Sequence, residues 1–304
     1  MDRNSIYYKQ VQLLMLVLPF VAKQDCFALK GGTAINLFVR DFPRLSVDID
    51  LVYLPMNGRD EALQEILEAL DSISADLRAT FRDIEVIEAY KSKSDALRLI
   101  VSRNGVQIKV ELSPVLRGTV FDPVLMGVRD AVEDEFGYAE IAVVALADLY
   151  AGKICAALDR QHPRDLFDVK WLLESEGLSD DLRKALLVYL SSHNRPVAEL
   201  LRPHFKDITA IYDGEFANMA KEYVSLKELV SVRERLVALI HQGLTDDERQ
   251  FLLSFENRKP EWALLGLEGV SELPAVKWKQ INLTKMSDDK HRQAFEKLEA
   301  VLAN

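Results

Sequence analysis

The chain has few cysteines, scattered histidines and no long apolar run. Cys26 and Cys155 are the two cysteines among 304 residues, so the sequence contains neither a disulfide framework nor a cysteine cluster for zinc. The most apolar stretch, 13–21, is too short to span a membrane, and no small-residue cleavage site follows it. These absences predict a reduced, cytoplasmic protein with no membrane partner.

Positive charge is also in short supply. Lys and Arg total 38 against 48 Asp and Glu, and the resulting net charge of −10 argues against a protein coated in positive charge for nucleic acid. A local basic groove is still compatible with this balance. Basic side chains gather near the C-terminus, at Lys277, Lys279, Lys285, Lys290, Arg292 and Lys297. We interpret that cluster as solvated helix faces.

The pattern of apolar residues divides the chain into two parts. Before about residue 140, strand periodicity is interspersed with helices, and the segments are helices at 4–22, 34–39 and 60–77 and strands at 27–29, 47–54, 83–89, 96–103 and 106–112. Asn104-Gly105 lies between the last two strands and predicts a type I′ hairpin turn.

Helical periodicity takes over in the second part. The predicted helices are 145–159, 164–175, 180–191, 225–242, 245–256 and 287–303. We therefore predict an α+β fold, in which a mixed sheet with flanking helices occupies 1–140 and a helical domain occupies 141–304.

A lysine-led glycine pair follows the first predicted strand, in the sequence Lys30-Gly31-Gly32-Thr33. A Gly-Gly turn lets backbone N–H groups approach a polyphosphate closely, because no Cβ atom stands in the way. Thr33 is predicted to be the N-cap of the helix 34–39. The segment is therefore a candidate triphosphate site.

Two aspartates occupy alternate positions of the strand 47–54. Asp48 and Asp50 share one face because alternate strand residues do, while Val47 and Ile49 point into a core. Two carboxylates on a rigid strand can bind Mg²⁺. Ser46 either contacts a phosphate or ends the preceding loop, and the sequence leaves both roles open.

Glu111 is the candidate third metal ligand. It shares its face of the strand 106–112 with Gln107 and Lys109, and a neighbouring strand would place it beside the two aspartates. Three carboxylates can hold two Mg²⁺ about 4 Å apart. The alternative is that Glu111 is the solvent side of a half-exposed strand, and the nearby motifs favour the metal role.

Lys153 falls inside an apolar stripe of the helix 145–159. The stripe consists of Leu146, Leu149, Tyr150 and Ala157. Burying an ammonium group is unfavourable without a partner, so Lys153 either extends its charge to water or points at an anion. We favour the second role, with a triphosphate as the anion.

The helix predicted over 164–175 carries polar residues in its first turns. Pro163 or Arg164 is its first residue, so Asp165 lies in the first turn, where a carboxylate suits the helix dipole. Asp168 shares its arc with Val169 rather than facing water, which favours a role in the site for Asp168.

As an ordered set, these motifs resemble the AbiEii/AbiGii group of nucleotidyltransferase toxins, which are relatives of the DNA polymerase β-like superfamily. The resemblance covers about 27–175, and its residues are Phe27-Ala28-Leu29-Lys30-Gly31-Gly32-Thr33-Ala34, Arg44-x-Ser46-x-Asp48-Ile49-Asp50-Leu51, Lys153 and Arg164-Asp165-x-x-Asp168. It implies a nucleotidyltransferase fold for the sheet domain. It also implies that the helical domain completes the active site.

The resemblance and the residue patterns together assign roles. The expected catalytic residues are Asp48, Asp50, Lys153 and Asp168. The expected nucleotide-binding residues are Lys30, Gly31, Gly32, Thr33, Ser46, Lys153, Arg164 and Asp165. The expected metal ligands are Asp48, Asp50 and Glu111, the last resting on the strand pattern alone.

The expected reaction is transfer of a nucleotide from a nucleoside triphosphate to an acceptor hydroxyl, with Mg²⁺ or Mn²⁺. The resemblance implies a toxin of a toxin–antitoxin or abortive-infection system, a tRNA 3′ end as acceptor and a cognate antitoxin, whose direct contact stays open. An alternative keeps the chemistry but uses a small molecule such as an aminoglycoside, or a protein hydroxyl, as acceptor. A third hypothesis is a non-catalytic module that senses a nucleotide.

Overall fold

The computed structural model describes residues 2–93 and 96–303, and the chain forms two compact units. Unit 1 comprises Met1–Ala145 and Ala217–Tyr223, and unit 2 comprises Leu146–Phe216 and Val224–Asn304. The two units divide at Ala145–Leu146, where the sequence predicted a boundary near residue 140. No pattern in the sequence predicts that 217–223 belongs with the sheet.

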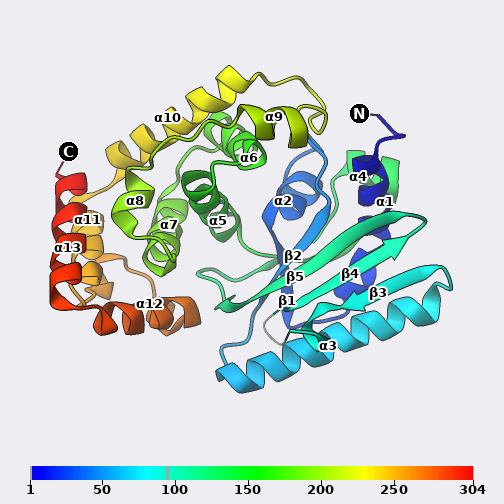
Figure 1. Cartoon of the computed structure of the whole chain (residues 1–304), viewed down its shortest axis with the longest axis horizontal. Coiled ribbons are helices and arrows are strands. Elements are labelled where there is room, and N and C mark those ends of the chain that lie inside the picture. The colour runs from blue at the N-terminus through cyan, green and yellow to red at the C-terminus, as the bar shows by residue number, and fades with distance from the viewer. Residues whose placement is uncertain (1, 94–95, 304) are drawn as a thin grey trace. The chain divides into compact units, whose positions relative to one another are not determined.

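Unit 1 is built on a seven-stranded mixed sheet in the order β3-β4-β5-β2-β1-β7-β6 (Figure 1). The strands are β1 (Phe27–Lys30), β2 (Asp48–Tyr53), β3 (Ile84–Glu88), β4 (Arg98–Arg103), β5 (Val106–Arg117), β6 (Val124–Gly127) and β7 (Glu140–Val143). The pairs β2–β5 and β1–β7 are parallel, and the other pairs are antiparallel. The α+β class predicted from the sequence is confirmed.

Alternation along the strands determines which face of the sheet is covered. In β5 the residues Val106, Ile108 and Val110 are buried while the positions between them are not. The buried face packs against α1 (Ile6–Val21) and α3 (Arg59–Thr80), which lie along the sheet (Figure 1). The opposite face keeps its polar side chains, and the candidate site lies there.

The hairpin between β4 and β5 forms as predicted. Asn104 has φ 51° and Gly105 has φ 75°, the left-handed conformations that a type I′ turn requires at both central positions. The helix predicted over 4–22 is α1, and Ser5 caps it by accepting a hydrogen bond from the Tyr8 N–H.

The prediction that Thr33 caps a helix is wrong. The helix begins earlier, as α2 (Gly31–Thr33) with Lys30 at the N-cap, and continues as the π-helix η1 (Ala34–Val39). Thr33 has helical backbone angles, φ −66° and ψ −44°, so it is inside the helix. Its hydroxyl is therefore turned toward the sheet instead of the helix end.

Several short elements of unit 1 have no counterpart in the prediction, among them β6, α4 (Asp130–Phe136) and β7. Each of the two strands has four residues, which is too short for alternation to be visible in the sequence. β7 is fixed by its neighbour, since Val143 pairs with Leu29 of β1.

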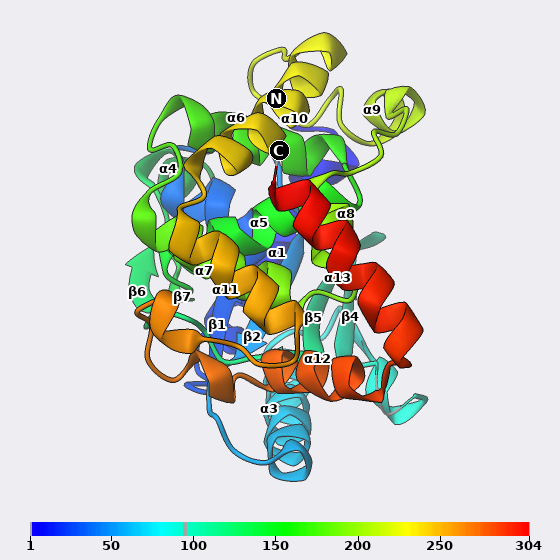
Figure 2. The same ribbon diagram turned by 90° about the vertical axis from the view of Figure 1, so that its left-hand side faces the viewer.

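Unit 2 is helical in its described residues. Its α-helices are α5 (Leu146–Asp159), α6 (Pro163–Glu174), α7 (Asp180–Ser192), α8 (Val197–Leu201), α9 (Thr209–Glu215), α10 (Leu226–Gly243), α11 (Asp246–Glu256), α12 (Pro274–Lys285) and α13 (Asp288–Leu302). α5 packs against α6 and α7, and α11 lies beside α13 (Figure 2). The six helices predicted for this part of the chain are all present. α8, α9 and α12 were not predicted, and two of these are short.

Two of the predicted helices begin with a capping box. Ser225 and Thr245 each form a capping box with the glutamate three residues later, at Glu228 and Glu248. No helix in the described residues is long and apolar enough to cross a membrane.

Candidate active site

A row of four charged residues crosses unit 1 on the uncovered face of the sheet. Lys30 of β1 is opposite Asp50 of β2, Asp50 is opposite Glu111 of β5, and Glu111 is opposite Arg98 of β4. Residues directly opposite each other in adjacent strands project from the same face. Asp48 also projects there and is opposite Lys109. The expected juxtaposition of Glu111 with the two aspartates is therefore present in the strand register.

Glu111 has an ion-pair partner in the protein. Its carboxylate contacts the Arg98 guanidinium, and the two side chains are 32% and 43% exposed. A pair this exposed contributes little to stability, about 0–1 kcal/mol, and can be exchanged for another ligand. Among residues 2–93 and 96–303, no three acidic, histidine or cysteine side chains lie close enough together to hold a metal ion.

Two glycines place the turn after β1 directly against three functional side chains. Gly31 has φ +75°, and a Cβ atom there would lie 2.5 Å from the Asp50 Oδ2 atom. A Cβ atom on Gly32 would lie 2.7 Å from Arg44 Nη2 and 2.8 Å from Ser46 Oγ. Neither position can hold a side chain without moving these groups, so the close approach requires glycine.

Thr33 and Ser46 connect this turn to the start of β2. The Thr33 Oγ1 atom lies 2.5 Å from the Asp48 carbonyl oxygen and 3.1 Å from Ser46 Oγ, and both side chains are buried. Asn36 Nδ2 donates to the Gly32 carbonyl at 2.9 Å and fixes the turn from the other side. Ser46 lies just before β2, where its hydroxyl meets that of Thr33, and its contact with a phosphate stays a prediction.

Arg44 belongs to the site, and residue patterns gave it no role. Its side chain is 2% exposed, and Nη1 donates to the Leu45 carbonyl at 2.8 Å. Backbone hydrogen bonds from Leu45 N to Met219 O and from Lys221 N to Pro43 O, each 2.8 Å, join this loop to residues 217–223. The signal in the sequence was its place in the Arg44-x-Ser46-x-Asp48 motif.

Unit 2 contains a second cluster of predicted residues. Lys153 Nζ of α5 lies 3.0 Å from Asp165 Oδ1 and 3.1 Å from Asp168 Oδ2, both on α6, and the three side chains are almost fully buried. Arg160 adds two hydrogen bonds to Asp165, at 2.5 and 3.0 Å. Lys153 does point at an anion, as expected, but in this structure the anion is a pair of carboxylates.

Charge partners control the ionisation of Asp165. Burial alone would raise the pKa of Asp165, but the Lys153 ammonium and the Arg160 guanidinium outweigh burial and lower that pKa well below its usual range. Asp165 is thus a carboxylate throughout the physiological range. Its position in the first turn of α6 adds a favourable interaction with the helix dipole.

Arg164 does not join this cluster. The His162 side chain caps α6 by accepting from the Arg164 N–H at 3.1 Å, and Arg164 Nη2 lies 3.3 Å from Glu215. Burial lowers the pKa of His162, opposed by its hydrogen bond to Glu215, which lies 3.1 Å away. The side chain of Arg164 is therefore held by Glu215 and not by the two aspartates.

Comparison with known proteins agrees with this geometry. The family model for the nucleotidyl transferase AbiEii toxin of type IV toxin–antitoxin systems matches residues 12–278. The chain belongs to the AbiEii family. It is therefore a nucleotidyltransferase, and a toxin of a type IV toxin–antitoxin system. The resemblance found in the sequence motifs is confirmed.

A solved structure shows that the fold extends beyond the motifs. The nucleotidyltransferase toxin MenT4 from Mycobacterium tuberculosis H37Rv superposes with a TM-score of 0.62 and 16% identity, covering 98% of this AbiEii chain and 93% of MenT4. At this identity the match establishes the shared fold alone. A comparison with curated proteins finds no significant match.

Membership in the AbiEii family implies a nucleoside triphosphate substrate and an antitoxin partner. The residues that the motifs single out fall into the two clusters described above, one in each unit. In unit 1 they are Lys30, Gly31, Gly32, Thr33, Ser46, Asp48, Asp50 and Glu111. In unit 2 they are Lys153, Asp165 and Asp168, with Arg164 turned away.

Proposed function

We propose that this protein transfers a nucleoside monophosphate from a nucleoside triphosphate to a hydroxyl at a tRNA 3′ end. The observation that carries the proposal is the packing of the Gly31-Gly32 turn onto Asp50, within a charged row that also contains Lys30 and Glu111. In this proposal the backbone N–H groups of the turn bind the phosphates beside these carboxylates.

The carboxylates of unit 1 fit a divalent metal. Asp48 and Asp50 are hard oxygen ligands on one strand face, and Glu111 can join them if it leaves Arg98. When bound, Mg²⁺ would supply positive charge for the α-phosphate and the departing pyrophosphate. Mn²⁺, which takes the same ligands, is an equivalent choice.

The other residues position the triphosphate. We assign the backbone of Gly31 and Gly32 to the phosphates, with Lys30 as a nearby cation and Thr33, Ser46 and Arg44 as the groups that hold the turn in place. Phosphoryl transfer needs little covalent help from a protein beyond such positioning and charge.

The residues of unit 2 supply a preorganised cation. Two N–H bonds of Lys153 are directed to Asp165 and Asp168, and an ammonium group has three. We assign the third to a substrate phosphate. The aspartates then hold Lys153 in position, and Asp165 is kept ionised for that task by Lys153 and Arg160. Arg164 lies one residue from Asp165, and its bond to exposed Glu215 can be exchanged for a nucleotide contact.

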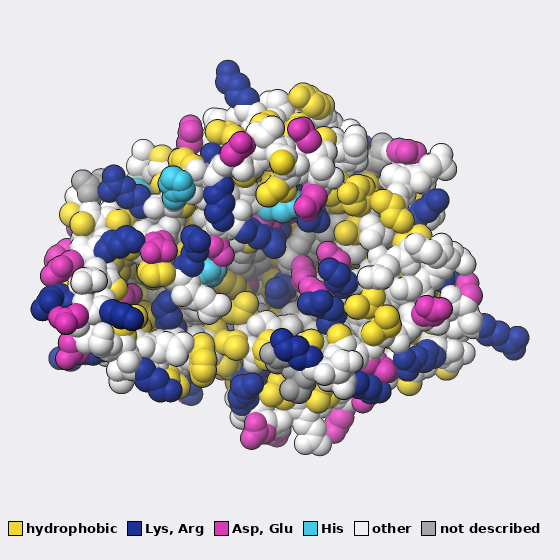
Figure 3. All heavy atoms as spheres, in the orientation of Figure 1, with side chains coloured by type: hydrophobic (Ala, Val, Ile, Leu, Met, Phe, Trp, Pro, Cys, Tyr) yellow, Lys and Arg dark blue, Asp and Glu magenta, His cyan; other side chains and the backbone are white. Residues whose placement is uncertain are grey.

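A small-molecule acceptor is the second candidate, favoured by the charge distribution. Most of the basic residues near the C-terminus are paired: Lys277 with Glu272, Arg292 with Asp289, Lys297 with Glu199, and Lys279 with the carbonyls of His193 and Arg195. On the face shown in Figure 3, basic and acidic side chains are interspersed. A cationic acceptor such as an aminoglycoside suits this acidic chain.

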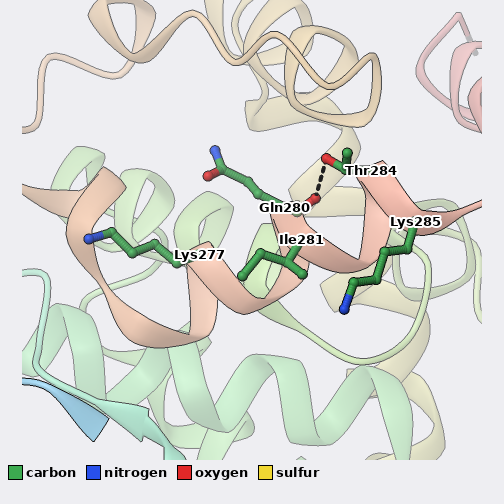
Figure 4. A pocket seen from close by; sticks show the side chains of 5 residues that line it. All are labelled: Lys277, Gln280, Ile281, Thr284 and Lys285. Atoms are coloured by element: carbon green, nitrogen blue, oxygen red, sulfur yellow. Dashed lines mark hydrogen bonds between the residues drawn. The ribbon is translucent and has the colours of Figure 1, made fainter.

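One feature on α12 favours RNA over that candidate. The helix carries an open pocket lined by Lys277, Gln280, Ile281, Thr284 and Lys285, with the two lysines toward its ends and Ile281 between them (Figure 4). Trp278 on the same helix is 50% exposed. Lysines beside exposed apolar side chains are compatible with a nucleic-acid contact.

Label transfer tests the proposal. The purified protein is incubated with total tRNA, Mg²⁺ and each labelled triphosphate in turn, in parallel with Asp48→Ala and with Glu85→Ala, a control on the exposed side of β3. We expect label on tRNA from wild type and Glu85→Ala, and a loss of at least about 100-fold in Asp48→Ala. Transfer by Asp48→Ala would refute the metal assignment. Label on an aminoglycoside or a protein would show that this molecule, and not tRNA, is the acceptor. Triphosphate binding without transfer to any acceptor would support the nucleotide-sensing module.

A further inference from the structure

Arg117, the last residue of β5, is a buried cation. Its side chain is 6% exposed, and neither Nε nor Nη1 has a hydrogen-bond partner among residues 2–93 and 96–303. Burial lowers the pKa of Arg117, yet a guanidinium stays protonated in proteins. Burying an unpaired charge is costly, so a position like this calls for an anion from outside the chain.

A strand irregularity puts Arg117 in this position. β2 and β5 are paired from Asp48 to Leu51, but the next register pair is Tyr53 with Arg117, so β5 has Ser113–Leu116 where β2 has Val52 alone. The extra residues form a local turn, in which Ser113 Oγ accepts from Leu116 N at 3.0 Å. Such bulges redirect side chains and are frequent beside functional sites.

The corner around Arg117 also contains the beginning of α3. Tyr53 is the link, because its backbone carbonyl accepts from Gly118 N at 2.8 Å and its hydroxyl lies 3.2 Å from Asn57 Oδ1. α3 has 22 residues, and its N-cap Gly58 makes no side-chain capping bond. The N-terminal N–H groups of a helix this long form an anion site.

This corner holds two arginines and three acids, and Arg117 is paired with none of the acids. Arg59, the first residue of α3, adds a second positive charge and lowers the pKa of Arg117 further. Among the acids, Glu65 accepts from the Tyr53 hydroxyl and lies 3.2 Å from Asn57 Nδ2. Asp60 and Glu61, in the first turn of α3, are exposed. None of the three acids forms an ion pair with Arg117.

We propose that Arg117, Arg59 and the first N–H groups of α3 bind a phosphate group. A guanidinium fork and a helix N-terminus are both suited to a tetrahedral oxyanion. The site is separate from the candidate active site, because Asp48 and Tyr53 are at opposite ends of β2, about 17 Å apart at 3.3 Å per residue. The phosphate can be inorganic, part of a nucleotide or part of an RNA backbone.

Phosphate titration of the full-length protein tests this site. Calorimetry at constant ionic strength compares wild type with Arg117→Met, Arg59→Met and Arg103→Met, the last being a matched control in which the arginine at the end of β4 loses its pair with Asp83. We expect saturable phosphate binding by wild type and Arg103→Met. We expect affinity at least about tenfold weaker in Arg117→Met and several-fold weaker in Arg59→Met, because charge-assisted bonds are lost.

Two further measurements separate a phosphate site from a purely structural role of Arg117 and from binding at the candidate active site. Without phosphate, Arg117→Met should unfold at the same urea concentration as wild type or higher, because an unpaired buried charge is removed. In Asp48→Ala, phosphate binding at this site should be unchanged. Equal binding by wild type and Arg117→Met, no binding by wild type, or a destabilised Arg117→Met would overturn the proposal. Pyrophosphate and a short RNA, titrated in the same way, identify the source of the phosphate.

Discussion

Replacing Lys153 by methionine tests how strongly the buried ion pairs stabilise unit 2. Methionine keeps most of the length and volume of lysine and removes the charge, so the packing of α5 changes little. In the variant, Asp165 and Asp168 both lose their ion pair with Lys153, and Asp165 keeps its pair with Arg160. The two aspartate side chains are 1% and 0% exposed. The change therefore isolates the effect of two buried carboxylates that lose a shared cation.

The expected loss is large because the pair is buried. Removing one partner of a buried ion pair reduces the free energy of unfolding by about 3–5 kcal/mol, whereas an exposed pair contributes about 0–1 kcal/mol. Lys170→Met is the matched control. Lys170 and Glu174 form an i,i+4 pair on the surface of α6, the helix that also carries Asp165 and Asp168. We expect the control to lose about 0.3–0.5 kcal/mol.

The effect has a defined pH dependence. In wild type the pKa of Asp165 is lowered in the folded state, so its ion pairs stabilise the protein above the ordinary aspartate pKa of about 3.9 and are lost as pH falls below that value. In Lys153→Met, Asp165 keeps Arg160 but has lost Lys153, so its pKa is lowered less and the variant gains less stability from this carboxylate as the pH rises. The difference between the two proteins should be largest near pH 7 and shrink toward about pH 4.

Urea unfolding monitored by circular dichroism at about pH 7, 5.5 and 4.5 measures this difference. The double variant Lys153→Met, Asp168→Asn should recover part of the stability, because one of the two buried charges is gone. A Lys153→Met protein as stable as Lys170→Met at neutral pH would refute the reasoning. So would a stability difference that grows as the pH falls.

Two other substitutions test the site and the fold. Gly31→Ala places a Cβ atom 2.5 Å from Asp50 Oδ2, so label transfer should fall at least about tenfold. The control is Gly105→Ala, which has the same φ of +75° and no atom within 4 Å of the added Cβ. It carries the same backbone strain of about 1 kcal/mol and should keep its activity. Equal activity of these two variants would show that the Gly31 contact is unimportant. Thr245→Ala removes the capping box of α11 and should lower the free energy of unfolding by about 1 kcal/mol in urea titrations. In the control Thr284→Ala, the replaced threonine is an exposed residue of α12, and the free energy of unfolding should change by less than about 0.5 kcal/mol. Equal losses in the two variants would argue against the cap.

Local signals in the sequence were sufficient for much of the fold. Asn104-Gly105 fixes the hairpin because few residues adopt the left-handed angles of its turn, and Thr245 with Glu248 fixes a helix start. Alternation along β2 correctly assigned Asp48 and Asp50 to one face. These features depend on residues close together in the chain.

Features that depend on distant residues were not predictable in this way. The pairing of 43–45 with 219–221 uses backbone groups, which leave no mark in side-chain periodicity. The predicted helix start at Thr33 was wrong because the short helix α2 precedes the π-helix η1 and continues into it. The pairing of Glu111 with Arg98 across β4 and β5 likewise required the strand register.

Three buried cations show how tertiary partners decide the role of a residue. Lys153 is neutralised by Asp165 and Asp168, which helix α6 presents at i and i+3. Arg44 donates to a main-chain carbonyl beside the glycine turn. Arg117 has comparable burial, and neither its Nε nor its Nη1 atom has a hydrogen-bond partner among the described residues. The first two cations stabilise the folded arrangement through partners within the chain, so their removal should weaken it. An anion supplied from outside would complete the third, and its removal should therefore weaken ligand binding and leave the fold intact.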